Sequence, residues 1–131
     1  MVGLDTNVLV RFFVRDDQTQ FEKAQALIRG ASSRGEPVLI SQLVLLETEW
    51  VLRSRYGLDK HAITAALSGL LDAVEFAIED EPSFEQALFM WKNSSAGFAD
   101  CLIGARHLRL GCRATASFDA SALRLPGFVA V

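Results

Sequence analysis

The chain has 131 residues, of which half are hydrophobic and 22% are charged, with a formal net charge of −3 and a pI near 5.3. This composition excludes an intrinsically disordered chain and is typical of an ordered globular protein. No apolar stretch approaches the ~18 residues that a membrane-spanning helix needs, and the N-terminus lacks the basic and apolar segments of a signal peptide. We therefore expect a single domain, residues 1–131, located in the cytoplasm.

The elements are predicted from hydrophobic spacing and from helix start and stop signals. Val2-Gly3-Leu4 is a short strand that ends in Asp5-Thr6-Asn7, three residue types that favour helix N-caps, so a helix follows up to Phe13. The remaining predicted elements, in chain order, are a helix over 17–34, a strand over 38–40, a helix over 41–56, a helix over 59–71, a strand over 74–78, a helix that opens at Glu81-Pro82, a helix over 98–110, a strand over 113–118 and a further strand over 128–131.

Strands that alternate with helices indicate an α/β fold. We expect a central, mainly parallel sheet of four to five strands with helices on both of its faces. The two cysteines, Cys101 and Cys112, have no partner at zinc-ligand spacing. They are expected to be small buried or half-buried thiols rather than a disulfide.

Two acids follow predicted strands, where ligands bind in open α/β sheets. Asp5 closes the first strand, and Asp119 follows the fourth in Ser117-Phe118-Asp119. A local explanation is also open for each of them, because Asp commonly caps the helix or turn that comes next.

Two further acids, Glu47 and Asp100, lie inside predicted helices. The neighbours of Glu47 at helical spacing are all apolar (Leu43, Val44, Trp50 and Val51), whereas Glu49 projects to the opposite side and is expected to be solvated. Asp100 has only Ala, Gly and Ile at the same offsets. A carboxylate on an apolar face is costly to bury unless it is paired, protonated or bound to a metal. Pairing with a distant Arg, or a place at the solvated edge of the face, remains the alternative for both.

Taken together, Asp5, Glu47, Asp100 and Asp119 could converge at one rim of the sheet. Four ionised carboxylates cannot stay in close contact without cations between them. Ligands that offer only oxygen select Mg²⁺ or Mn²⁺ over zinc. Such ions activate water and clamp phosphate oxygens, so phosphoryl transfer is the reaction class that this set of residues favours.

Four segments resemble, in order and spacing, the motifs of PIN domains, and most closely those of the VapC-type toxins of bacterial toxin–antitoxin modules. The segments are Leu4-Asp5-Thr6-Asn7-Val8-Leu9, Leu46-Glu47-Thr48-Glu49-Trp50-Val51-Leu52, Phe98-Ala99-Asp100-Cys101-Leu102-Ile103 and Ser117-Phe118-Asp119. Each motif alone is weak, but four in order over essentially the whole chain are specific. Ser117 stands where Thr is commoner, and it keeps the hydroxyl.

The resemblance implies a parallel α/β/α sandwich whose acids bind Mg²⁺ or Mn²⁺ and hydrolyse phosphodiester bonds in RNA, often in tRNA or ribosomal RNA. It makes Asp5 and Asp100 the principal metal ligands, with Glu47 and Asp119 completing the acidic pocket. It gives supporting positions to Thr6, Asn7 and Ser117.

The resemblance also implies a homodimer that a small antitoxin silences. Apolar candidates for such contacts are Phe12, Phe13, Leu70, Leu71 and Trp91, each of which is alternatively an ordinary core residue.

An acidic pI argues mildly against a nucleic-acid partner. Ten of the thirteen basic residues are Arg, however, and its guanidinium suits bidentate contacts with phosphate. The candidates for RNA phosphate contacts, which follow or flank the motif segments, are Arg11, Arg15, Arg53, Lys92 and Arg106.

Two other enzyme classes fail at a named residue. A receiver-type phosphoacceptor domain would need a Lys at the end of the last strand, and residues 127–131 contain none. A haloacid-dehalogenase-type phosphatase would need Asp at position 7, which is Asn. A non-catalytic protein-binding module with a structural metal site remains the alternative from another class.

Overall fold

The computed structural model describes all 131 residues and divides them into two compact units, Met1–Glu79 and Asp80–Val131. None of the helices combines the length and the hydrophobicity that crossing a bilayer requires.

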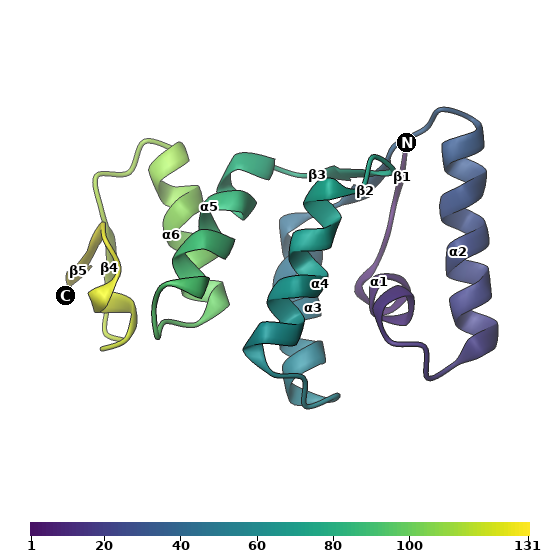
Figure 1. Cartoon of the computed structure of the whole chain (residues 1–131). Coiled ribbons are helices and arrows are strands. Elements are labelled where there is room, and N and C mark those ends of the chain that lie inside the picture. Colours follow the sequence, from purple (N-terminus) through teal and green to yellow (C-terminus); the bar gives the residue numbers. More distant parts are fainter. The chain divides into compact units, whose positions relative to one another are not determined.

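The first unit is a three-stranded parallel sheet with four helices (Figure 1). Its strands pair in the order β1-β2-β3, with Val2 opposite Val38 and Val38 opposite Phe76. Its elements in chain order are β1 (Val2–Gly3), α1 (Thr6–Phe13), α2 (Gln18–Ser33), β2 (Val38–Ile40), α3 (Gln42–Ser54), α4 (Lys60–Asp72) and β3 (Phe76–Ile78).

Side-chain caps fix the beginning of every helix in this unit. In each case a carboxylate or hydroxyl oxygen accepts a hydrogen bond from a backbone N–H of the first turn, which would otherwise lack a partner. The capping residues are Asp5, Asp17, Ser41 and Asp59. The turn after α3 contains Gly57 with a φ of +63°, which glycine adopts without strain.

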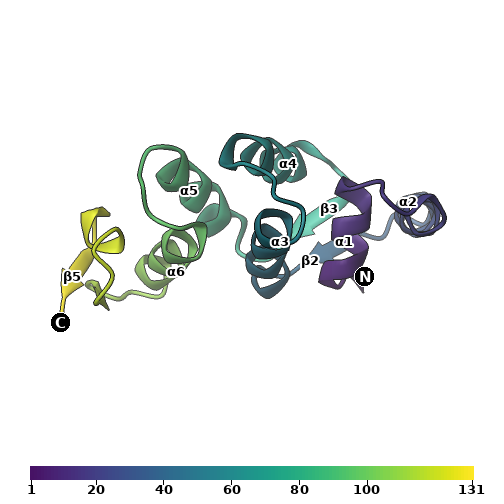
Figure 2. The same cartoon turned by 90° about the horizontal axis from the view of Figure 1, so that it is seen from below.

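The helices of the first unit lie in the order α2, α1, α3, α4, as Figure 2 shows from below. The core between them and the sheet is built from fully buried aliphatic side chains, among them Leu9, Ile40, Leu45, Ile63 and Leu67. This packing places the carboxyl ends of β1 and β2 beside each other and starts α1 and α3 from neighbouring points.

The second unit consists of a helical pair and a two-stranded parallel sheet. Its elements are α5 (Glu81–Lys92), α6 (Phe98–Arg109), β4 (Thr115–Ser117), the short 3₁₀ helix η1 (Ala122–Arg124) and β5 (Phe128–Ala130). Helices α5 and α6 pack through an aromatic cluster. The centroid of the Phe98 ring lies 5.3 Å from the centroid of Trp91 and 6.4 Å from that of Phe84. Trp91 is therefore a core residue, as its alternative interpretation had it.

A buried carboxylate ties α5 to α6. Asp80 precedes α5 with a φ of +50°, and its side chain is 6% exposed. It accepts a hydrogen bond from the hydroxyl of Ser83 and forms ion pairs with Arg106 at 2.8 Å and with Arg109 at 2.7 Å, both on α6. Burial would raise the pKa of the Asp80 carboxyl. The bond from Ser83 and the charges of Arg109 and Arg106 outweigh burial, so its pKa lies below the ordinary value.

The α/β class and the parallel strand pairing are confirmed, but the strands are grouped differently from the prediction. They form a three-stranded and a two-stranded sheet instead of one sheet of four to five strands. Every strand is only two or three residues long, so few ladder hydrogen bonds define each sheet. The single-domain boundary stays a prediction. Neither cysteine forms a disulfide, as expected. Cys101 is buried, but Cys112 is exposed, so the expectation of a buried or half-buried thiol is wrong for Cys112.

Replacing glycine by alanine should have opposite effects on stability at two helical positions, Gly69 and Gly104. A Cβ at Gly69 in α4 would meet nothing within 4 Å, so Gly69→Ala should raise the free energy of unfolding by about 0.5–1 kcal/mol through helix propensity. A Cβ at Gly104 in α6 would lie 2.5 Å from Cε1 of Phe128. The overpacking there should cost ~1–3 kcal/mol and cancel or reverse the gain. Urea denaturation of both variants checks the pair, and equal stabilisation of both would contradict the Phe128 contact.

Candidate active site

Asp5 lies two residues after the end of β1 and is the N-cap residue of α1. Its Oδ1 accepts a hydrogen bond from the Val8 backbone N–H at 3.1 Å, so the capping role considered for this residue is confirmed. Oδ2 makes no hydrogen bond or ion pair, and the residue is exposed. The cap therefore fixes the orientation of the carboxyl group and leaves its second oxygen accessible to a ligand.

Glu47 lies in the second turn of α3, on the face of the helix that the sequence analysis expected to be apolar and buried. That expectation is wrong, because Glu47 is exposed and so are its neighbours Leu43 and Trp50 (78% and 53%). The face of α3 that packs inward is the stripe of Leu45, Thr48 and Leu52 with their neighbours.

The other glutamate of this motif, Glu49, is correspondingly not the solvated acid that was expected. It is 4% exposed and lies within the buried stripe. Its two oxygens accept hydrogen bonds from Arg53 at 2.8 Å and 3.4 Å, one helical turn along. Positions 47 and 49 are about 200° apart around a helix, so only one of the two can lie on the buried face. Glu49 can be buried there because the charge of Arg53 compensates its carboxylate.

The structure brings Asp5 and Glu47 together. A surface hollow of about 430 Å³ is lined by Asp5, Thr6, Asn7, Leu43, Val44 and Glu47. Neither carboxylate has a basic partner, since no ion pair includes either of them. The hollow is thus an acidic site at the carboxyl ends of β1 and β2, where α/β sheets bind their ligands.

Asp100 and Asp119 interact in the second unit. Asp100 lies half-buried in the first turn of α6 and has no basic partner. Burial raises the pKa of its carboxyl, and the negative charge of Asp119 raises it further. The two carboxylates therefore repel each other, and a cation beside them would relieve the repulsion.

Asp119 caps the turn that leads into η1, as its local explanation had it. Its Oδ1 accepts hydrogen bonds from the backbone N–H groups of Ser121 at 2.8 Å and of Ala122 at 3.0 Å. The Ser117 hydroxyl oxygen in turn accepts a hydrogen bond from the Asp119 backbone N–H at 3.0 Å. Ser117 thus supports the turn that carries Asp119.

The four acids accordingly fall into two pairs, one in each unit. Neither unit by itself gathers three or more Asp, Glu, His or Cys side chains that could hold a metal ion. The neutral supporting residues differ in exposure, because Thr6 is buried and Asn7 is exposed beside the hollow.

Three of the basic residues suggested for RNA contacts already have partners within their own unit. Arg53 binds Glu49, Arg106 binds Asp80, and Arg15 stacks over the Phe21 ring at 4.2 Å. Lys92 is exposed at the end of α5. The remaining candidate, Arg11, lies at the centre of a hydrogen-bonded network.

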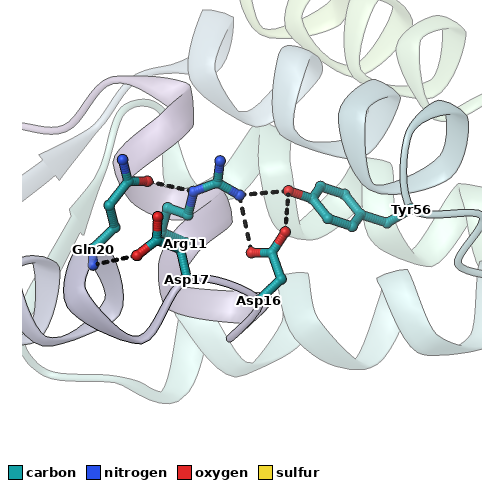
Figure 3. Close-up of polar contacts among 5 residues, drawn as sticks. All are labelled: Arg11, Asp16, Asp17, Gln20 and Tyr56. Carbon is teal, nitrogen blue, oxygen red and sulfur yellow. Dashed lines mark hydrogen bonds and ion pairs between the residues drawn. The ribbon is translucent and has the colours of Figure 1, made fainter.

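Figure 3 shows this network, which joins α1 to α2 and to the end of α3. The guanidinium of Arg11 donates to the side-chain amide oxygen of Gln20 at 2.5 Å, to the Asp16 carboxylate at 3.0 Å and to the Tyr56 hydroxyl at 2.6 Å. The Tyr56 hydroxyl also donates to Asp16, at 3.2 Å. The bond with Tyr56 raises the pKa of Arg11 above its ordinary value.

None of the partners of Arg11 was predicted from the sequence. Tyr56 is 45 positions away from Arg11, and no local pattern connects the two. The only signal available was that Tyr56 is the single tyrosine of the chain.

The chain is similar to known proteins in both sequence and structure. The chain is 24% identical over 115 residues to a VapC ribonuclease of Aquifex aeolicus, covering 88% of this chain and 84% of that protein. It is also similar to the crystal structure of VapC20 of Mycobacterium tuberculosis, a toxin that cleaves the sarcin–ricin loop. That match has a TM-score of 0.45 and 23% identity over 93% of this chain and 92% of that one. The family model of the PIN domain matches residues 2–127, and the chain belongs to the PIN-domain family.

Proposed function

We propose that this chain is a metal-dependent endoribonuclease and the toxin of a toxin–antitoxin pair, acting in the cytoplasm on structured RNA such as tRNA or rRNA. The observation that carries the proposal is the set of four acids in the PIN motif positions. Each of them lacks a basic partner, and they lie in two pairs. The VapC ribonuclease that matches most of the chain supports an RNA substrate.

The residues present fit Mg²⁺ or Mn²⁺. All four side chains offer carboxylate oxygens, which these ions prefer over the nitrogen and sulfur ligands typical of zinc. The raised pKa of Asp100 is that of a carboxyl group that lacks a compensating positive charge. When bound, such an ion activates water and stabilises the leaving oxygen in phosphodiester hydrolysis.

The roles proposed for the side chains are those that the resemblance to PIN domains implies. Asp5 and Asp100 are proposed as the principal metal ligands, with Glu47 and Asp119 completing the acidic pocket. The hydrogen bond from the Val8 backbone N–H holds the Asp5 carboxylate in one orientation. The hydrogen bonds from the backbone N–H groups of Ser121 and Ala122 do the same for Asp119. Thr6, Asn7 and Ser117 are proposed as supporting residues.

The proposed antitoxin has a suitable surface in the first unit. A hollow of about 330 Å³ is lined by residues of α1, α2, α4 and β3, including Phe12, Phe13, Leu70 and Phe76. Its apolar lining suits the apolar face of a small partner's helix. A homodimer is proposed as well, and light scattering of the purified chain tests it.

The proposed activity is tested by incubating the purified, partner-free protein with total cellular RNA and Mg²⁺ or Mn²⁺. We expect discrete cleavage products that disappear when EDTA removes the metal. Intact RNA in every sample, together with a metal titration that shows no binding, would contradict the proposal and favour a non-catalytic module.

A further inference from the structure

A second hollow of the first unit shares residues with the acidic one. It has a volume of about 280 Å³ and lies against α1 and α2. Asp5 and Asn7 line both hollows, so the two are immediate neighbours on the surface of this unit. The second hollow differs from the first in its charge, because Arg11 and Lys23 also line it.

The two cations of this hollow are not equivalent. Arg11 is paired with Asp16 at 3.0 Å, so much of its charge is balanced. Lys23 is exposed on α2 and takes part in no ion pair of the structure. Lys23 therefore supplies the uncompensated positive charge of this hollow.

The network of Figure 3 also orients neutral donors beside it. The side-chain oxygen Oε1 of Gln20 accepts a hydrogen bond from Nε of Arg11. This bond fixes the orientation of the side-chain amide and leaves its Nε2 to donate to another group. Figure 3 shows that Nε2 of Gln20 and the remaining terminal nitrogen of Arg11 point in the same direction, on the side away from Asp16. Neither nitrogen has a hydrogen-bond partner. Two pre-positioned N–H donors next to a lysine suit a phosphate group.

We propose that this hollow binds a phosphate of the RNA strand next to the one that is cleaved, with Lys23 and the oriented Gln20 amide as its contacts. The proposal rests on the ribonuclease function proposed above. Successive phosphates of one strand are neighbours, as the two hollows are, so the strand would place one phosphate at the acidic hollow and the adjoining one at Lys23. Arg11 positions Gln20 and offers its remaining terminal nitrogen to the same phosphate.

Binding of a fluorescently labelled, short single-stranded RNA to the Asp100→Asn chain, which keeps the RNA intact, tests the proposal. Adding Lys23→Gln should weaken binding roughly three- to tenfold and flatten the slope of log K against log salt by about 0.7, the effect of one lost phosphate contact. Lys23→Arg should restore both. Gln20→Ala should weaken binding and leave the salt slope unchanged, because the amide is neutral.

Lys60→Gln is the matched control, since it removes the same charge from a lysine of α4 that does not line this hollow. If RNA is cleaved by the unmodified chain and Lys23→Gln behaves as Lys60→Gln does, the phosphate subsite is wrong and the ribonuclease proposal stands. If RNA is neither bound nor cleaved, the ribonuclease proposal is wrong. A titration with inorganic phosphate, in which NMR follows the chemical shifts of the Gln20 side-chain amide, then tests the subsite independently. Saturable shifts support it, and their absence overturns it.

Discussion

Replacing Asp100 by Asn should lower the rate of RNA cleavage roughly 10³-fold or more, because it removes a proposed metal ligand without changing the shape of the side chain. The same variant should be more stable than the unmodified chain when no metal is present. Asn carries no charge to desolvate and does not repel Asp119, so a gain of about 0.5–1 kcal/mol is expected.

The pH dependence of this gain has a defined sign. Since the pKa of Asp100 is raised in the folded state, the folded chain binds more protons than the unfolded chain, and its stability falls as the pH rises through that pKa. The gain from Asn should thus be full at neutral pH and vanish in acid, where Asp100 is protonated. Thermal unfolding in EDTA at several pH values measures it. Glu85→Gln, at an exposed position of α5, is the control. Lower stability of Asp100→Asn at neutral pH would contradict the repulsion.

Asp80→Ala should lower the free energy of unfolding by about 2 kcal/mol. The change removes a buried carboxylate and with it the contacts to Ser83, Arg106 and Arg109. The two guanidinium groups are 38% and 52% exposed, so water takes over part of their solvation and keeps the loss moderate. Ala at a φ of +50° adds about 1 kcal/mol of strain.

Asp80→Asn separates the charge from the backbone strain, because Asn tolerates the left-handed conformation. The pKa of Asp80 is lowered in the folded chain, so the ion pairs stabilise the protein fully above the ordinary pKa and cease to do so as the pH falls through the lowered one. Urea unfolding at neutral and at strongly acidic pH should show a difference between the unmodified chain and Asp80→Asn that shrinks in acid. A difference that is independent of pH would mean that the ion pairs contribute nothing.

The sequence predicted the elements of this fold well, since local signals control them. Capping side chains at Asp5, Ser41 and Asp59 mark helix starts, and Gly57 and Gly111 mark ends. The lengths and grouping of the strands could not be predicted, because strand pairing depends on contacts between distant residues.

The acidic motifs were recognisable, whereas the surroundings of their side chains were not. On α3 the large apolar residues Leu43 and Trp50 suggested a buried face around Glu47, yet they are exposed. The buried face instead contains Glu49, which the charge of Arg53 compensates. Apolar periodicity alone cannot distinguish a core face from an exposed apolar surface. The Asp80 ion pairs and the Arg11 network escaped prediction for a related reason, as they join residues far apart in the chain.

The strictly parallel pairing of the strands has a consequence for how the chain folds. Each strand must find a partner that lies well away in the sequence, as Val2 does with Val38, and no hairpin can nucleate a sheet locally. Helices α5 and α6, by contrast, are joined by residues 93–97 only and pack closely. Because loop closure over long segments slows folding, we expect the α5–α6 pair to become protected from hydrogen exchange first during refolding, with the β1-β2-β3 ladder acquiring protection last.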